Sequence, residues 1–305
     1  MKQNRRAFLQ LLGAGGLTLA AGSSEASEGP SIPADAVGCL VDLSLCGVCR
    51  KCEAACNKAN DLPPPATSFE DMTVLEEPRR PSATALTVVN RYDEVQCNGH
   101  PAHAKVQCMH CLDPACVSAC IVGALTKDPK GPVRYEASKC IGCRYCMVAC
   151  PFQIPSYEYD EVLTPRVMKC EFCFARLEEG KIPACAAACP NEAITFGNRD
   201  GLLAIADDRV AAPPDPLRKR EKLIDHVYGE HEVGGTSWMY LATVPFNQLG
   251  FLDLPDKAPP RLTETIQHSI FKYFVPPAAL YGFLGAAMYL MRPRKATGSS
   301  EEGEQ

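Results

Sequence analysis

The sequence has little of what marks a nucleic-acid-binding protein or an enzyme with its own catalytic centre. Its formal net charge is −5 at pH 7, so it lacks the basic excess that favours binding to nucleic acid. It has neither a dinucleotide-binding glycine fingerprint nor a phosphate-binding loop, and no Ser, His and Asp arrangement typical of nucleophilic catalysis. Cysteine is absent after residue 189. We therefore expect no nucleic-acid partner and a chain that is not itself an enzyme.

Cysteine is abundant before that point, with 18 among 305 residues. Sixteen cysteines fall into four runs of short, regular spacing, and only Cys39 and Cys97 stand apart. Runs one and three have the spacing Cys-x2-Cys-x2-Cys-x3-Cys. Run two widens the second interval to four residues, and run four widens it to eleven. The runs are Cys46, Cys49, Cys52 and Cys56; Cys108, Cys111, Cys116 and Cys120; Cys140, Cys143, Cys146 and Cys150; and Cys170, Cys173, Cys185 and Cys189.

This spacing indicates iron–sulfur clusters. Two residues between cysteines let a turn aim successive thiolates at one centre, with backbone amides pointing toward the anionic sulfides. Disulfides are the first alternative, but a bond between cysteines with only two residues between them would close a strained local loop. Structural zinc is the second, and its paired Cys-x2-Cys pattern fits run four alone. Arg50, Lys51, Arg144 and Lys169 lie in or beside the runs, either as cations that stabilise reduced clusters or as solvated surface charges.

The N-terminus has the pattern of an export signal. Arg5 and Arg6 precede a modest apolar run and then small residues up to Ala26. This order predicts a twin-arginine signal peptide over residues 1–26, rather than a basic helix of a soluble protein. Because the twin-arginine route carries folded proteins, the thiols can be loaded with metal before export.

The C-terminus has the pattern of a membrane anchor. Residues 274–291 contain no charge and are long enough to span a bilayer. A buried helix of a soluble protein is the alternative. Arg292, Arg294 and Lys295 follow the apolar segment, and such a basic cluster stays in the cytoplasm. We therefore expect the bulk of the chain on the periplasmic side of the bacterial inner membrane, held by one C-terminal transmembrane helix.

Hydrophobic alternation predicts short strands beside the cysteine runs. Residues 200–230 have a helical pattern with a proline-rich break at 213–216. The expected strands cover residues 39–46, 84–92, 191–197 and 236–244, with a hairpin over residues 123–136.

The stretch CMHCLDPAC, residues 108–116, resembles the second run of a known family. This family comprises the four-cluster ferredoxin-like subunits of membrane-bound oxidoreductases, including formate dehydrogenase, dimethyl sulfoxide reductase and polysulfide reductase. With the signal and the anchor added, the chain most resembles the HybA-type subunits of periplasmic, quinone-linked [NiFe] hydrogenases. Residues 234–246, GGTSWMYLATVPF, resemble the stretch ahead of the anchor in those subunits.

The resemblance implies an α+β fold of two interleaved two-[4Fe–4S] ferredoxin-like lobes and one C-terminal transmembrane helix. The implied order begins with a signal peptide (1–26), the first part of lobe A with a linker (27–83), lobe B (84–164) and the second part of lobe A (165–200). A cap without clusters (201–265), the membrane anchor (266–291) and a cytoplasmic tail (292–305) follow.

The resemblance also implies how the runs share four [4Fe–4S] clusters, since the fourth cysteine of a run binds the cluster of its paired run. Asn57 and Ile121 stand where the family pattern has a proline after that fourth cysteine. The implied ligand sets are Cys46, Cys49, Cys52 and Cys189; Cys170, Cys173, Cys185 and Cys56; Cys108, Cys111, Cys116 and Cys150; and Cys140, Cys143, Cys146 and Cys120.

The function that the resemblance implies is electron transfer without bond-making chemistry. Electrons would pass between a periplasmic catalytic subunit, with [NiFe] hydrogenase as the first candidate, and a quinone-reactive integral membrane subunit. The alternatives are the equivalent subunit of a formate dehydrogenase or molybdopterin reductase, and a zinc-stapled scaffold protein that moves no electrons.

Overall fold

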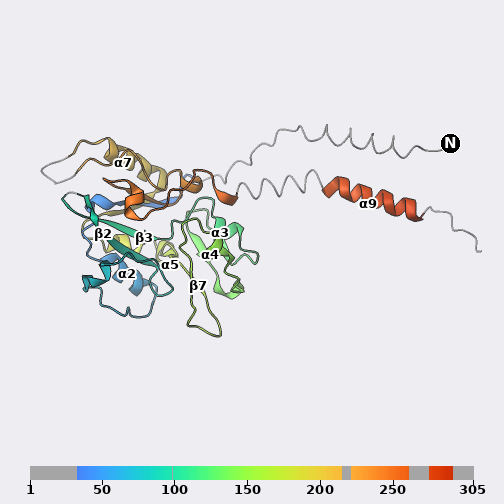
Figure 1. The fold of residues 1–305 in the computed structure, drawn as a ribbon, viewed down its shortest axis with the longest axis horizontal. Helices are drawn as coiled ribbons and strands as arrows, with labels where there is room; N and C mark the ends of the chain where they lie inside the picture. The colour runs from blue at the N-terminus through green and yellow to red at the C-terminus, as the bar shows by residue number, and fades with distance from the viewer. Residues whose placement is uncertain (1–32, 98, 215–220, 261–274, 291–305) are drawn as a thin grey trace, which may run out of the picture. The chain divides into compact units, whose positions relative to one another are not determined.

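The computed structural model describes residues 33–97, 99–214, 221–260 and 275–290. The chain divides into two units, one of residues 28–261 and one that joins residues 1–27 to residues 262–305. The expected signal peptide, residues 1–26, and the expected tail, residues 292–305, lie outside the described residues. The fold of the larger unit is a mixture of short helices and small sheets (Figure 1).

The centre of the larger unit is a three-stranded sheet that joins distant parts of the chain. Strand β1 (Val37–Asp42) lies between antiparallel β8 (Ile194–Asn198) and parallel β9 (Trp238–Leu241). Helix α7 (Arg199–Ala211) packs on one face, where Leu40 and Leu202 belong to the same buried cluster. On the opposite face, Val41 of β1 and Trp238 of β9 belong to the larger buried cluster that also contains cysteines of the runs. Because both faces are covered, β1 and β9 are almost continuously apolar.

A hairpin and several short helices surround the first and fourth cysteine runs. Strands β2 (Thr87–Cys97) and β3 (His100–Gln107) pair antiparallel, and β2 lies against helix α2 (Lys51–Ala59). Glu53 fixes this contact, because its Oε1 accepts a hydrogen bond from the Val89 amide at 2.6 Å. Helix α6 packs on α2 from the side of the fourth run. The helices of the fourth run are α5 (Phe174–Glu178) and α6 (Ala184–Ala187).

The second and third runs are embedded in smaller elements with a smaller core. Leu125, Val133 and Val167 form this core with Cys116 and Cys146. The helices here are α3 (Ala115–Ser118) and α4 (Tyr145–Ala149), and the two-stranded sheets pair β4 (Leu125–Lys127) with β5 (Val133–Tyr135) and β6 (Ser156–Tyr157) with β7 (Val167–Met168). The 3-10 helices of the larger unit are η1 (Leu43–Leu45), η2 (Met72–Leu75), η3 (Ala137–Lys139), η4 (Glu232–Gly234) and η5 (Phe246–Leu249).

All four expected strands and the expected hairpin are confirmed, and one helix prediction is partly wrong. Strands β1, β2, β8 and β9 and the β4–β5 hairpin lie within or overlap the ranges that the sequence predicts. The predicted helix is confirmed up to Ala211 and ends just before the predicted proline-rich break, because Ala212 adopts the extended conformation that a following proline favours. Residues 215–220 lie outside the described residues, and residues 221–230 are not helical. Beyond the break the chain runs beside β9 instead, where the Tyr228 amide donates to the Tyr240 carbonyl at 3.1 Å.

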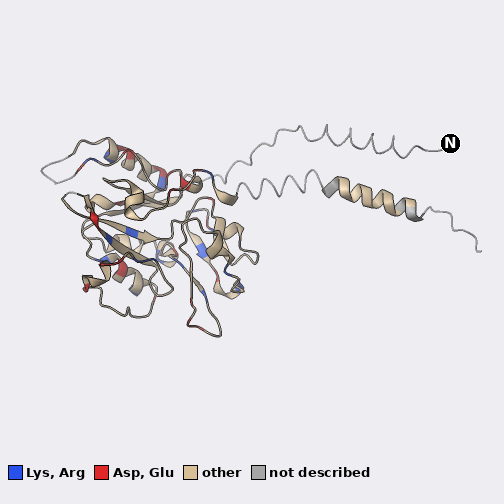
Figure 2. Cartoon of the chain, in the orientation of Figure 1, with Lys and Arg blue, Asp and Glu red and all other residues tan. Residues whose placement is uncertain are grey.

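Helix α9 (Val275–Leu290) belongs to the other unit and is described by itself. It has 16 residues and carries no charged side chain (Figure 2). Among the described helices, none is both long enough and apolar enough to cross a membrane. Residues 266–274 and Met291 of the predicted anchor lie outside the described residues. The expected anchor therefore stays a prediction.

Candidate metal centres

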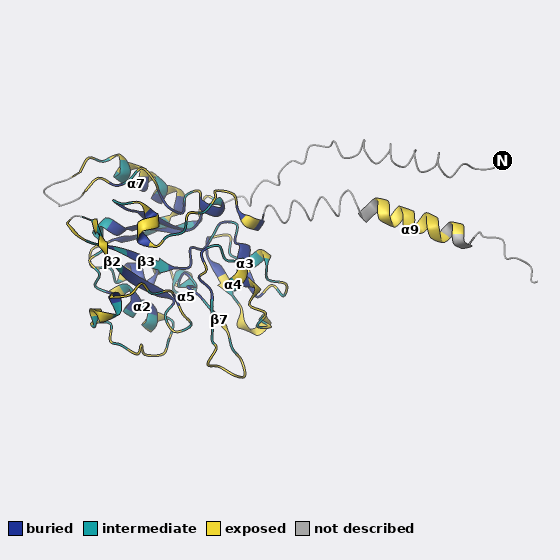
Figure 3. Cartoon of the chain, in the orientation of Figure 1, coloured by how far each residue is buried: buried dark blue, intermediate teal, exposed yellow. Residues whose placement is uncertain are grey.

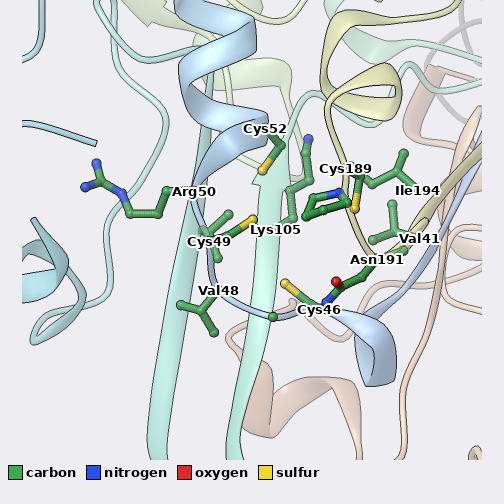
Figure 4. Close-up of a pocket in the computed structure, with 14 residues that line it drawn as sticks. Val41, Cys46, Val48, Cys49, Arg50, Cys52, Lys105, Cys189, Asn191 and Ile194 are labelled. Carbon is green, nitrogen blue, oxygen red and sulfur yellow. The ribbon is translucent and has the colours of Figure 1, made fainter. Parts of the chain in front are cut away.

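The sixteen cysteines of the runs come together in four groups that join distant parts of the chain. Group 1 contains Cys46, Cys49 and Cys52 from the first run and Cys189 from the fourth. All four line one small cavity that is partly open to solvent. Figure 4 shows their sulfur atoms directed toward the same space. Burial raises the pKa of Cys46 to about 11, and Cys189 and Cys49 also raise it.

Group 2 contains Cys56, at the end of the first run, with three cysteines of the fourth run. Burial raises the pKa of Cys56 to about 12, and both Cys185 and Cys173 contribute in the same direction. Burial also raises the pKa of Cys170 well above its ordinary value, and its strongest thiol neighbour is Cys56. The last cysteine of run one has therefore left its own run and lies with run four.

Groups 3 and 4 repeat this exchange between the second and third runs. Burial raises the pKa of Cys111 far above its ordinary value, and Cys108, Cys116 and Cys150 raise it further. Burial likewise raises the pKa of Cys146 to about 11, with further contributions from the remaining thiols of its group. Group 3 is Cys108, Cys111, Cys116 and Cys150, and group 4 is Cys120, Cys140, Cys143 and Cys146.

These proximities agree with the ligand sets that the family resemblance implies, although the strongest thiol neighbour of Cys52 is Cys185 of group 2. The described His, Cys, Asp and Glu side chains form no group of three tight enough for one metal ion. A [4Fe–4S] cluster needs a different arrangement, with four thiolates around a cube. The assignment of individual ligands stays a prediction.

Each run repeats one backbone feature that prepares it for an anionic centre. The residue before the second cysteine has a positive φ in all four runs, at Val48, His110, Gly142 and Phe172. A positive φ is unfavourable for residues other than glycine, so at Val48, His110 and Phe172 the surrounding fold must impose it. The Phe172 amide points at the Cys170 sulfur at 3.4 Å, and Gly142 repeats the contact to Cys140 at 3.5 Å. Amides aimed at sulfur stabilise thiolate and sulfide charge.

Buried lysines lie beside the thiol groups. Lys105 and Lys169 are each 3% exposed, and within the described residues neither forms an ion pair. Lys169 donates to the carbonyls of Val133 at 2.5 Å and Cys170 at 3.1 Å. Buried charges are normally paired, because desolvation of a single charge is costly. Anionic clusters on the neighbouring thiolates would supply the missing negative charge, so the residues present fit such a group.

The cations named from the sequence have different environments. Lys51 and Arg144 are exposed, which fits solvated surface charges, whereas Lys169 is buried. Arg50 is also buried, but it binds Glu53 at 3.0 Å and the carbonyls of two loop residues, so it is already paired. The sequence does not indicate that Lys105 is buried beside the thiol groups. It lies three positions before the second run in a strand, and nothing in its spacing separates it from an exposed strand lysine.

His110 is a second functional candidate whose burial the sequence did not indicate. It is fully buried, and its Nδ1 accepts a hydrogen bond from the Val133 amide at 2.8 Å. Its ring packs edge-on against Phe172 at 4.9 Å between centroids, which joins the second run to the fourth. Burial lowers the pKa of His110 well below its ordinary value, and the nearby Lys169 and Lys127 act in the same direction. His110 thereby packs the second run against the fourth.

Comparison with known proteins gives this geometry a family. Residues 102–199 match the family described as the 4Fe–4S dicluster domain. The chain is 36% identical over 308 residues to the Hydrogenase-2 operon protein HybA of Escherichia coli O157:H7, and the alignment covers 91% of this chain and 92% of HybA. The chain belongs to the family of 4Fe–4S dicluster ferredoxin-like subunits. This confirms the resemblance on which the cluster assignment rests.

Other relatives extend the same family. The chain is 34% identical over 248 residues to the iron–sulfur subunit of the nitrate-inducible formate dehydrogenase of Escherichia coli strain K12, with 80% of each chain covered. It is 50% identical over 266 residues to a protein of Nitratidesulfovibrio vulgaris strain Hildenborough, with 85% of this chain and 70% of that protein covered. The mixed α+β fold with a ferredoxin-like cluster domain is confirmed, and 4Fe–4S clusters are the cofactors that the family binds.

Proposed function

We propose that the chain carries four [4Fe–4S] clusters, one on each thiol group, and relays electrons between two partner subunits. A bound cluster supplies reversible uptake of single electrons, and the chain supplies the thiolates, their spacing and the surrounding charges. The proposal assigns no substrate chemistry to the chain itself.

One observation carries this proposal, namely that neighbouring groups form a continuous series. Cys52 of group 1 has Cys185 of group 2 as an electrostatic neighbour. Cys170 of group 2 has Cys108 of group 3 in the same role. The series continues because Cys116 of group 3 has Cys146 of group 4 as a neighbour. Clusters on these groups would stand in the order 1, 2, 3, 4, which is the arrangement that stepwise electron transfer requires.

The catalytic partner that we propose is a periplasmic [NiFe] hydrogenase. The alignment with HybA covers 91% of the chain, whereas the alignment with the formate dehydrogenase subunit covers 80%. The alternative is the equivalent subunit of a formate dehydrogenase or molybdopterin reductase. Metal analysis of the complex purified through this chain separates them, because nickel supports the hydrogenase and molybdenum or tungsten contradicts it.

The second partner that we propose is an integral membrane subunit that reacts with quinone. An export signal over residues 1–26 and an anchor over residues 266–291 would place the clusters on the periplasmic side of the inner membrane. An exposed apolar surface around group 4 supports a tightly bound partner. It includes Ile141, Tyr145, Val148, Val162 and Leu163, which are 61% to 88% exposed. This set is named the group 4 surface below.

The decisive experiment is anaerobic purification of the full chain with its partners, followed by iron and acid-labile sulfide analysis and reductive titration. We expect about sixteen irons per chain, as four [4Fe–4S] clusters require, and electron uptake at each. A colourless protein that contains zinc would instead support the scaffold alternative. A lower iron count with intact, reduced thiols would contradict the proposal.

A further inference from the structure

Lys105 is a buried cation whose partners are neutral. Its Nζ donates to Gln107 Oε1 at 2.6 Å and lies 4.6 Å from the centre of the Trp238 ring. An amide oxygen and an aromatic face offset only part of the cost of burying an ammonium group. Such a group persists in a folded protein when a larger negative charge lies nearby.

Lys105 lies beside the thiol groups, so a cluster bound to these thiolates would supply that negative charge. Its side chain lines the group 1 cavity, and Figure 4 shows it reaching from β3 into the space among Cys49, Cys52 and Cys189. Burial alone would lower the pKa of Lys105, but nearby acidic groups, with Cys185 and Cys52 the strongest, outweigh burial and raise it. Since these two thiols belong to groups 2 and 1, Lys105 stands between the two groups.

The cap segment holds Lys105 in this position. Gln107, which accepts the hydrogen bond from Lys105, donates from its Nε2 to the hydroxyl of Tyr240. Trp238, whose ring lies over the ammonium group, is on the same strand, β9. Both aromatic side chains are fully buried, so their orientations are fixed by packing. A segment without cysteines thereby contributes to the surroundings of the first two groups.

We propose that Lys105 is a positioning residue for electron transfer, a fixed positive charge shared by the clusters of groups 1 and 2 that raises the reduction potentials of both. This inference rests on the proposed function, because it requires clusters on those groups. A cluster held by these thiols would gain one negative charge on uptake of one electron from the catalytic partner, with no bond made or broken, and the Lys105 ammonium group would face that added charge. A nearby positive charge in a poorly solvated site stabilises the reduced form more than the oxidised form.

The charge acts selectively because of where it lies. Lys105 influences the pKa of thiols in groups 1 and 2, among them Cys46, Cys52 and Cys56. In group 3, Lys127 lowers the pKa of Cys111 and Lys169 lowers the pKa of Cys116. We therefore expect removal of Lys105 to change the potentials of two clusters and leave the other two unchanged.

The test is a redox titration of the full chain in its complex, followed by electron paramagnetic resonance, with Lys105→Met. We expect an unchanged iron count and at least a tenfold weaker equilibrium constant for reduction of clusters 1 and 2. This factor corresponds to a downward shift of 59 mV for one electron. Lys105→Arg should restore most of the difference, because it keeps the charge. Lys51→Met removes an exposed charge beside the same run and should shift neither potential.

A second variant covers the case in which Lys105→Met disturbs folding. Gln107→Glu keeps the size of the side chain and places a negative charge against Nζ, so both potentials should fall while Lys105 remains in place. Unchanged potentials in the folded variants, or equal shifts at all four clusters, would overturn the inference. An iron count far below sixteen in the unaltered complex would instead contradict the proposed function, so the two failures are distinguishable.

Discussion

Runs one and three have identical cysteine spacing, yet the structure surrounds them very differently. Arg50 and Arg144 occupy the same position of the two runs and share a left-handed backbone conformation, with φ of 53° and 60°. Arg50 is 2% exposed beneath the loop that contains Ser68 and Asp71. Arg144 is exposed and lies over Tyr157 at 5.4 Å. The spacing therefore determines the local turn, and the rest of the chain determines the burial.

The same contrast holds for the regions around these runs. The inner region, which comprises α2, α6, β2, β3 and the β8-β1-β9 sheet, surrounds groups 1 and 2 and has a large buried core. The outer region, which comprises α3, α4 and β4 to β7, has a core cluster of only five buried residues among those described, and it carries the group 4 surface. Figure 3 shows the difference between the buried parts of β2 and β3 and the exposed segments near α4. The inner region therefore shields its thiol groups from solvent, whereas the outer region leaves large apolar side chains exposed.

The largest expected effect is the loss of a whole cluster, and it tests how the outer region is interleaved. Cys150→Ala should remove or convert the cluster of group 3, because Cys150 lies with Cys108 and Cys111 although it belongs to run three. Up to one quarter of the iron would be lost, with a changed paramagnetic resonance signal for one cluster.

The control for this change is Cys56→Ala, which alters the equivalent position of the inner region. It should affect group 2 and leave groups 3 and 4 intact. A Cys150→Ala protein in which only the group 4 signal is lost would refute the exchange of fourth cysteines between runs.

A smaller effect is expected from Glu53, which holds the inner region together. Its Oε1 accepts from Arg79 at 2.6 Å and its Oε2 accepts from Arg50 at 3.0 Å, with Glu53 itself 4% exposed. Glu53→Gln leaves two guanidinium groups without a counter-charge and should cost about 3–5 kcal/mol of local stability. Hydrogen exchange of α2 and β2 amides measures this change as faster local opening.

The matched control is Glu158→Gln in the outer region, where the ion pair with Arg166 at 2.8 Å is largely exposed. Exposed pairs contribute about 0.2–1 kcal/mol, so exchange near β6 and β7 should change little. Equal effects of the two substitutions would show that burial does not distinguish the regions.

These contrasts mark the limit of what the sequence could predict. The cysteine runs, the β4–β5 hairpin and strands β1, β8 and β9 follow from spacing and alternation, because those signals are local. The burial of Lys105 could not be predicted, since it depends on Trp238 and Tyr240, more than 130 positions away. The helix predicted after the prolines is absent from residues 221–230 for a similar reason, because pairing of Tyr228 with Tyr240 of β9 outweighs the local helical preference. Long-range packing decides what local patterns leave open.

The group 4 surface gives a prediction of intermediate size for the outer region. Leu163 is 88% exposed in the loop between β6 and β7. Burying a leucine in an interface contributes about 1.5–3 kcal/mol, so Leu163→Ser should weaken binding of a partner subunit about tenfold or more. Quantified copurification from solubilised membranes measures the loss, with the iron count unchanged. Ile205→Ser on α7, where the side chain is 39% exposed, is the control and should retain both partners.

The smallest expected effect is a pH dependence confined to the β2–β3 hairpin of the inner region. Burial, together with the adjacent Arg91, lowers the pKa of His103 to about 4. The unfolded chain takes up this proton near pH 6.5, whereas the folded hairpin takes it up only near pH 4. The hairpin is therefore more stable above pH 6.5 and loses that stability as the pH falls from 6.5 to about 4. Hydrogen exchange of β2 and β3 amides should accelerate over this range, after correction for intrinsic exchange, and His103→Gln should remove the extra acceleration. Since His103 is partly exposed, the change should be smaller than that of Glu53→Gln, and an identical pH profile in the two proteins would contradict the assignment.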